Sequence, residues 1–337
     1  MSTQVEAAPT PVGDAVEMTA REAVNAALED ELASDPTVYM LGEDIASDGG
    51  VFKTNGGLPD KFPGRILNTP ICENTFIGMA IGMSVTGLRP VVEIMFSDFL
   101  ATCWDMIANQ VAKTRYMTDG QVSLPLVIRT ANGGGSRFGA QHSQSLENWA
   151  MAVPGLKVVA PSTPADAKGL LAAAIRDPDP VLFFEQKSLY GNKGEVPDGE
   201  HVDSLGTARV LRDGKDCTIV ALAAMVPRAL AAAAELERAG IHATVVDVRC
   251  LVPLDTSTIL GEISKTGRLF TVEENPRLCG WGAEIVSIAA EECFDDLDGP
   301  IVRITTPHVP LPAAQPMEDE AMPTVARIVR TVMGAMR

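Results

Sequence analysis

The sequence predicts an α/β protein of two doubly wound domains, and three observations carry that prediction. Strand-length segments such as 38–42 (VYMLG) are apolar almost throughout, which is typical of parallel strands covered on both faces. Helical segments separate these strands along the chain. The alternation occurs twice, and residues 189–206, which are rich in Gly, Pro and charge, interrupt it.

The first half begins with a helix over 19–35, because Thr19 and Glu22 have the spacing of a capping box. A helix from Thr163 to Ile175 is expected, since Pro164 and Asp166 suit its first turn. Two further helices are predicted from Glu73 to about Gly87 and over 98–117. The predicted strands of this half are 38–42, 90–96, 124–130, 156–161 and 181–186.

The second half repeats the alternation of strands and helices. Its predicted strands are 217–223, 243–248, 269–274 and 301–305, and its predicted helices are 227–239, 256–266, a helix from about 282 and a closing helix from 323. We therefore divide the chain into a disordered tail (1–16), a first domain (17–188), an interdomain linker (189–206) and a second domain (207–337). The acidic, proline-containing start has no basic or apolar stretch, so it is not predicted to be a signal peptide.

Composition excludes several classes of function. The net charge of −17 argues against nucleic acid and anionic membranes as partners. No apolar run is long enough to span a bilayer. The six cysteines form no CxxC pair and the four histidines no ligand-spaced cluster, which favours reduced thiols in a cytoplasmic protein over disulfides or zinc.

Candidate site residues follow the predicted strands, because parallel sheets bind ligands beyond the carboxyl ends of their strands. Glu43 follows the first strand, Phe99 the second, and a glycine-rich loop with His142 the third, while Glu73 begins a helix. Each has an alternative explanation. Glu73 could bond to its own backbone, Phe99 could be core, and His142 could bond to nearby amides. No GxGxxG, GxxxxGK[ST] or GxSxG motif is present.

Long stretches resemble one known family over nearly the whole chain after residue 17. They are LGED, FPGRILNTPICENTFIGMAIGMSVTGLRPVVEIMFSDF, NQVAKTRYM, GAQHSQ, PGLKVVAPSTPADAKGLLAAAIRDPDPV and GRLFTVEENPR. The sequence resembles the beta subunits of the decarboxylating component of 2-oxo acid dehydrogenase complexes, which include pyruvate, branched-chain and acetoin dehydrogenases. The resemblance implies a pyrimidine-binding first domain and a transketolase-like second domain.

The same resemblance implies thiamine diphosphate as the cofactor. Glu73 matches the acid that hydrogen-bonds a nitrogen of the aminopyrimidine ring, and Phe99 matches the aromatic residue that stacks on that ring. His142 matches a histidine at the substrate end of the site, where it would exchange protons with the intermediate or the lipoyl thiol. Glu43 matches an acid near the cofactor. We therefore expect Glu73 and His142 to be catalytic, and Glu73, Phe99 and Glu43 to bind the cofactor.

A structural potassium site is implied as well. Its ligands would be the carbonyl groups of Leu126, Ala174, Ile175 and Asp177, with a contribution from Asp179 where some relatives have Asn.

The family resemblance covers half of a cofactor site. Thiamine-diphosphate enzymes hold Mg²⁺ through a GDG motif, and this chain has none. We therefore expect an alpha subunit to hold the Mg²⁺, an α2β2 assembly that is inactive without that subunit, and a lipoyl acyltransferase core as the acceptor. Single-chain transketolases, which carry both halves, fit less well.

Two questions stay open at this level. The TTPHVPLP segment, with His308, resembles acetoin-type members, but pyruvate and other 2-oxo acids remain candidate substrates. A non-catalytic scaffold or regulatory subunit, or a flavoprotein-like electron-transfer subunit, is the alternative class of function.

Overall fold

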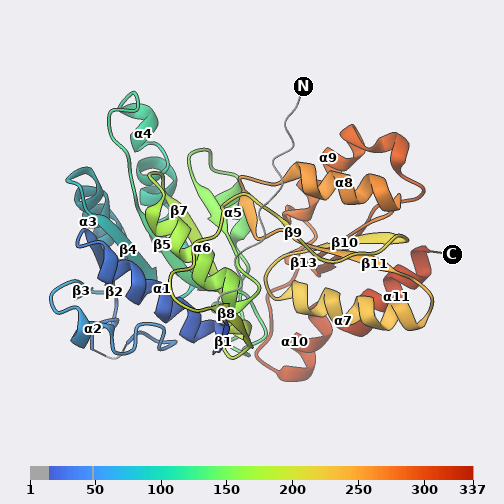
Figure 1. Cartoon of the computed structure of the whole chain (residues 1–337), viewed down its shortest axis with the longest axis horizontal. Helices are drawn as coiled ribbons and strands as arrows, with labels where there is room; N and C mark the ends of the chain where they lie inside the picture. The colour runs from blue at the N-terminus through green and yellow to red at the C-terminus, as the bar shows by residue number, and fades with distance from the viewer. Residues whose placement is uncertain (1–14, 48, 337) are drawn as a thin grey trace.

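The computed structural model describes residues 15–47 and 49–336, which form two α/β halves lying side by side (Figure 1). The predicted tail falls mostly outside these residues. Ala15 and Val16, which we assigned to it, already belong to strand β1 (Ala15–Thr19). In the described part of the chain, no helix is both long and apolar enough to cross a membrane.

The first half is built on a sheet of seven strands in the order β12-β6-β7-β5-β4-β2-β3. Its strands are β2 (Val38–Gly42), β3 (Ile66–Asn68), β4 (Arg89–Ile94), β5 (Val127–Asn132), β6 (Lys157–Val159), β7 (Val181–Gln186) and β12 (Cys250–Val252). All neighbours pair in parallel except β12, which pairs antiparallel with β6. The predicted parallel sheet is confirmed, with one edge strand supplied by the second half.

Successive side chains of these strands point to opposite faces, so the sheet borders two cores. Met40 and Phe183 pack on one face with α1 (Ala20–Ser34) and α6 (Pro164–Arg176). Residues of the other face, such as Leu41, pack against α3 (Glu73–Val85). The capping box of α1 is confirmed, because Thr19 Oγ1 accepts a hydrogen bond from the Glu22 N–H at 3.2 Å and the Glu22 carboxylate accepts one from the Thr19 N–H at 2.8 Å.

The predicted long helix over 98–117 is wrong in detail. The chain there forms three short pieces, a 3₁₀ turn η1 (Ser97–Thr102), a π-helical turn η2 (Met106–Val111) and α4 (Thr114–Met117). The first two pieces keep apolar residues such as Leu100 and Ile107 facing the sheet, so hydrophobic spacing alone does not distinguish them from an α-helix, whereas α4 has no buried residue. The other short helices of this half are α2 (Leu58–Lys61), α5 (Glu147–Met151) and η3 (Lys187–Leu189).

The second half contains a five-stranded sheet in the order β14-β13-β10-β11-β9. Its strands are β9 (Arg209–Arg212), β10 (Cys217–Ala221), β11 (Ala243–Asp247), β13 (Leu269–Pro276) and β14 (Val302–Thr306), parallel except for β9. Its helices are α7 (Met225–Arg238), α8 (Thr256–Thr266), α9 (Gly282–Glu292), η4 (Phe294–Asp296), α10 (Gln315–Ala321) and α11 (Val325–Ala335). Helices α7 and α11 cover one face, and α8 and α9 the other.

The predicted linker contains a strand that its composition did not indicate. Strand β8 (Lys193–Pro197) pairs antiparallel with β1, and the two form a separate ribbon beside the first sheet. Val196 is fully buried in the core that α1 and α6 share. Part of residues 189–206 is therefore packed onto the first half rather than lying free between the halves.

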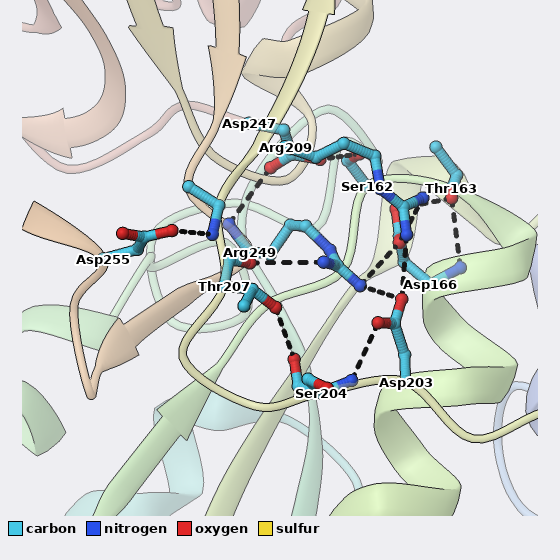
Figure 2. A network of polar contacts seen from close by, with 11 residues as sticks. Ser162, Thr163, Asp166, Asp203, Ser204, Thr207, Arg209, Asp247, Arg249 and Asp255 are labelled. Carbon is cyan, nitrogen blue, oxygen red and sulfur yellow. Dashed lines mark hydrogen bonds and ion pairs between the residues drawn. The ribbon is translucent and has the colours of Figure 1, made fainter. Parts of the chain in front are cut away.

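The two halves are joined where the chain passes from β11 to β12. Arg249, between these strands, adopts a positive φ of 59° and turns the chain out of one sheet and into the other. Its buried guanidinium lies 3.1 Å from Asp166 of α6 and also pairs with Asp203, while Ser162 donates a hydrogen bond to Asp247 (Figure 2). Burial and the nearby Asp166 carboxylate raise the pKa of Asp247 to about 7.

Candidate active site

The candidate residues gather at the carboxyl ends of four neighbouring strands. Glu43 follows β2, Phe99 follows β4, and the loop 133–146 with His142 follows β5. Lys187 follows β7, the next strand of the sheet. Because β2, β4, β5 and β7 are adjacent and parallel, these segments lie along one edge of the sheet, as the sequence predicted.

Two acids, Glu43 and Glu73, interact at this edge. Glu43 is buried, and its Oε1 atom has no hydrogen-bond partner among the described residues. Burial raises its pKa, and the negative charges of Glu73 and Asp44 raise it further. A buried carboxyl oxygen without a donor is costly in a protein that binds nothing there.

Glu73 is the first residue of α3 and is half-buried. No hydrogen bond joins its carboxylate to the backbone within the described ranges, and the N-cap, Cys72, makes no side-chain cap either. The alternative of an acid bonded to its own helix is therefore not what this structure contains. The same carboxylate lies near the buried Cys103, where burial and the charge of Glu73 raise the thiol pKa to about 12.

Aromatic rings hold the candidate histidine. The His142 ring meets the Phe96 ring edge-on at a centroid distance of 4.7 Å and the Phe99 ring at 5.4 Å. Phe96 and Phe99 also contact each other at 5.9 Å. Across 15–47 and 49–336, no side-chain hydrogen bond joins His142 to an amide, so ring packing orients it. Phe99 is half-buried at the margin of the core, where one part of the ring stays accessible.

Sequence reasoning missed Lys187. Its side chain is buried, its Nζ atom lies 5.4 Å from the centre of the Phe96 ring, and that atom has no hydrogen-bond partner in the described structure. Burial lowers its pKa to about 8, although the nearby carboxylates, Asp98 foremost, oppose that shift. The available signal was its position at the carboxyl end of the predicted strand 181–186, the edge where the other candidate residues were expected.

The glycines 133–135 allow a close approach to the loop, and side chains of both halves make that approach. Gly133 has a positive φ of 80°, and a Cβ atom there would collide with the side chains of Gln186 and Glu274. A Cβ atom on Gly134 would lie 2.6 Å from Leu311 Cδ1. Beside the loop, a cavity of about 630 Å³ is lined by Gln141, Gln144, Leu278, Cys279, His308 and Val309.

Comparison with known proteins decides the family. Residues 16–193 match the family model "Transketolase, pyrimidine binding domain", and residues 206–328 match "Transketolase, C-terminal domain". An acetoin:2,6-dichlorophenolindophenol oxidoreductase subunit beta from Cupriavidus necator is 45% identical over 325 residues, 94% of this chain and 96% of the relative.

The chain belongs to the transketolase-like E1 beta subunits of 2-oxo acid dehydrogenase complexes. A pyruvate dehydrogenase E1 component subunit beta-2 from Oryza sativa subsp. japonica is 46% identical and spans 95% of this chain and 87% of the relative. A solved structure, described as an inactive beta4 tetramer of a split-gene transketolase, superposes with a TM-score of 0.78 at 26% identity over 95% of this chain and 98% of that one.

In this E1 beta subunit the loop implied to bind potassium is rich in oxygen atoms, which suits a hard cation. The carbonyl oxygens already accept hydrogen bonds, that of Ile175 from Arg89 at 2.9 Å and that of Leu126 from the Val181 N–H at 3.0 Å. The Lys157 ammonium binds the Asp177 carboxylate at 2.6 Å. Two cationic side chains, Arg89 and Lys157, therefore already contact part of the proposed ligand set, and the potassium site stays a prediction.

Proposed function

We propose that this chain supplies the aminopyrimidine half of a thiamine diphosphate site in a dehydrogenase that acts on 2-oxo acids or acetoin. The observation that carries the proposal is the Glu43–Glu73 pair at the start of α3, with an unpartnered buried carboxyl oxygen. The half-exposed Phe99 and the ring-held His142 beside it support the proposal. These groups fit a flat, nitrogen-bearing ring better than a purely structural role.

Each residue then has a defined task. Glu73 holds a proton at a nitrogen of the pyrimidine ring, and Phe99 packs on the face of that ring. Glu43, whose raised pKa favours the protonated form, lowers the repulsion between the two acids. Phe96 and Phe99 exclude water from the side on which His142 lies. Thiamine diphosphate, when bound, supplies the electron sink for decarboxylation.

The diphosphate end needs a partner subunit. Within the described ranges, no group of three or more His, Cys, Asp or Glu side chains is placed to hold a metal ion. We propose that an alpha subunit with a GDG motif holds Mg²⁺, that two copies of each subunit assemble, and that a lipoyl acyltransferase accepts the product. The six free cysteines support a reducing compartment, for which we propose the cytoplasm.

A substrate screen tests this function. The chain is co-expressed with its alpha subunit, and acetoin, pyruvate and branched-chain 2-oxo acids are offered with an artificial electron acceptor. We expect turnover of at least one substrate that requires both thiamine diphosphate and Mg²⁺. The segment with His308, which lines the cavity beside the loop, resembles acetoin-type members, and acetoin is therefore the first candidate. Absence of all turnover, with a flavin spectrum in the purified protein, would instead support the electron-transfer alternative.

His142→Ala is expected to slow acyl transfer to the lipoyl group on the order of 100-fold, because a positioned proton donor is lost. The affinity for thiamine diphosphate should stay within about twofold, since no proposed cofactor contact is removed. Rates with a lipoyl domain and titration of the cofactor measure the two effects separately. Loss of cofactor binding, rather than of transfer, would show that His142 is structural.

A further inference from the structure

The loop 133–146 is closed on itself at its base. The Gly133 N–H donates to the Gln144 carbonyl at 2.9 Å, so the two ends of the loop lie together and His142 projects from the part between them. Ring packing against Phe96 and Phe99 orients the His142 side chain. From the first half, Asp98 Oδ1 also accepts hydrogen bonds from the Gln144 N–H at 3.3 Å and from the Gln144 side-chain amide at 2.8 Å, so part of the base is held there. The position of His142 therefore depends on what holds the base.

One carboxylate of the second half holds both ends of that base. Glu274, on β13, accepts hydrogen bonds at Oε1 from the Gly134 N–H at 2.5 Å and from the Ser145 hydroxyl at 2.8 Å. Its other oxygen accepts from Gln186 Nε2 at 2.8 Å, at the end of β7. The Glu274 side chain is buried. Hydrogen bonds to a carboxylate contribute more to stability in such a site than they do in water.

A second acid, Glu318 of α10, holds the outer side of the loop. Its fully buried carboxylate accepts from the Gly135 N–H at 2.9 Å and pairs with Arg137. Arg137 also pairs with Asp319 at 2.8 Å. Arg137 has a positive φ of 66°, a strained conformation for a non-glycine residue that persists only where contacts enforce it.

The charges of this arrangement are balanced from the first half. Lys187 lies near Glu274 and Glu318, and also near Asp98 and Glu147, and all four carboxylates favour its charged form. Burial raises the pKa of Glu147 to about 7. The two loop-holding acids thus accept hydrogen bonds from N–H and O–H donors, and the buried Lys187 cation lies near both without bonding to either.

We propose that Glu274 and the Glu318–Arg137 pair are positioning residues for His142. The second half then takes part in the reaction by setting where the catalytic loop stands relative to Phe96 and Phe99. This inference rests on the proposed role of His142 in acyl transfer, and it assigns no substrate contact to Glu274, Glu318 or Arg137.

The test compares two half-reactions in the assembled complex. Glu274→Ala and Arg137→Met should each slow transfer to a lipoyl domain roughly tenfold or more, since small displacements of a reacting group carry penalties of that order. Dye-coupled oxidation of the substrate and the affinity for thiamine diphosphate should change less than about twofold. Glu274→Gln should restore much of the transfer rate, because an amide oxygen still accepts from Gly134 and Ser145.

The matched control is Lys265→Met, which removes a surface cation that also pairs with two acids, Asp213 and Glu262, away from the loop. This variant should transfer at the wild-type rate. On a His142→Ala background, neither Glu274→Ala nor Arg137→Met should slow transfer further, because the residue they position is gone.

Three results would overturn the inference. In the first, Glu274→Ala and Arg137→Met both transfer at the wild-type rate while His142→Ala transfers slowly. This result would refute the positioning role and leave the proposed role of His142 intact. The second is an undiminished effect of these variants on the His142→Ala background. The third is normal transfer by His142→Ala itself, which removes the proposed role of His142 and the positioning role together.

Discussion

Glu73→Gln is expected to abolish decarboxylation by the assembled enzyme while leaving the fold intact. Glutamine keeps the shape of the side chain but cannot exchange a proton with the pyrimidine ring, and losing a positioned proton-transfer group costs on the order of 100-fold or more. Glu73 makes no hydrogen bond to the backbone of α3 in the described structure, so the substitution removes no helix cap. Steady-state turnover with the preferred substrate measures the loss.

The control for this variant is Glu284→Gln, which changes an exposed acid in the first turn of α9, a helix of similar length in the second half. Its turnover should equal that of the wild type. Thermal melting and the assembly state of both variants should also match the wild type. If assembled Glu73→Gln keeps more than about half of the wild-type turnover, the assignment of Glu73 is wrong.

The purified chain alone should bind almost no thiamine diphosphate. The contacts that it offers, one charged hydrogen bond from Glu73 and one aromatic contact from Phe99, are worth about 2–4 kcal/mol gross. Micromolar affinity needs about 8 kcal/mol net. The described residues include no cluster of side chains placed to hold the metal ion that the diphosphate needs. The net charge of −17 on the chain also disfavours binding of an anion. Isothermal titration of the isolated chain should therefore show no saturable heat.

Addition of the alpha subunit should create Mg²⁺-dependent binding and a four-chain assembly, which titration and light scattering would detect. The decisive comparison is the isolated chain with and without Mg²⁺. Micromolar binding that requires Mg²⁺ but no partner would refute the proposed half-site and would support a self-sufficient enzyme.

Local sequence signals were sufficient for most of the fold. The apolar segment at Val181–Gln186 and the capping box of α1 each have one strong structural interpretation, and both are confirmed. The failures have a physical cause as well. Strand β12 has three residues and owes its existence to pairing with β6, a contact that no local pattern encodes. Strand β8 depends in the same way on β1.

Some residues of the candidate site were predicted from the sequence and others were missed, again because long-range contacts leave no local pattern. Resemblance to a family indicated Glu73, Phe99 and His142, and the fold places them along one sheet edge, although their roles stay predictions. The hydrogen bonds of Glu274 and Glu318 to the loop join residues more than a hundred positions apart. Such contacts follow from how the two halves pack, which the sequence patterns do not specify.

The edge strand β12 also has a consequence during synthesis. The first sheet ends at β6, and its outer partner, Cys250–Val252, is synthesised only after the linker and the first strands of the second half. At about 5–20 residues per second, the β6 edge waits several seconds with unpaired N–H and carbonyl groups. Completion of the N-terminal sheet is thus coupled to translation of the C-terminal half, and a nascent chain that stalls before residue 250 presents an open edge to other chains and to chaperones.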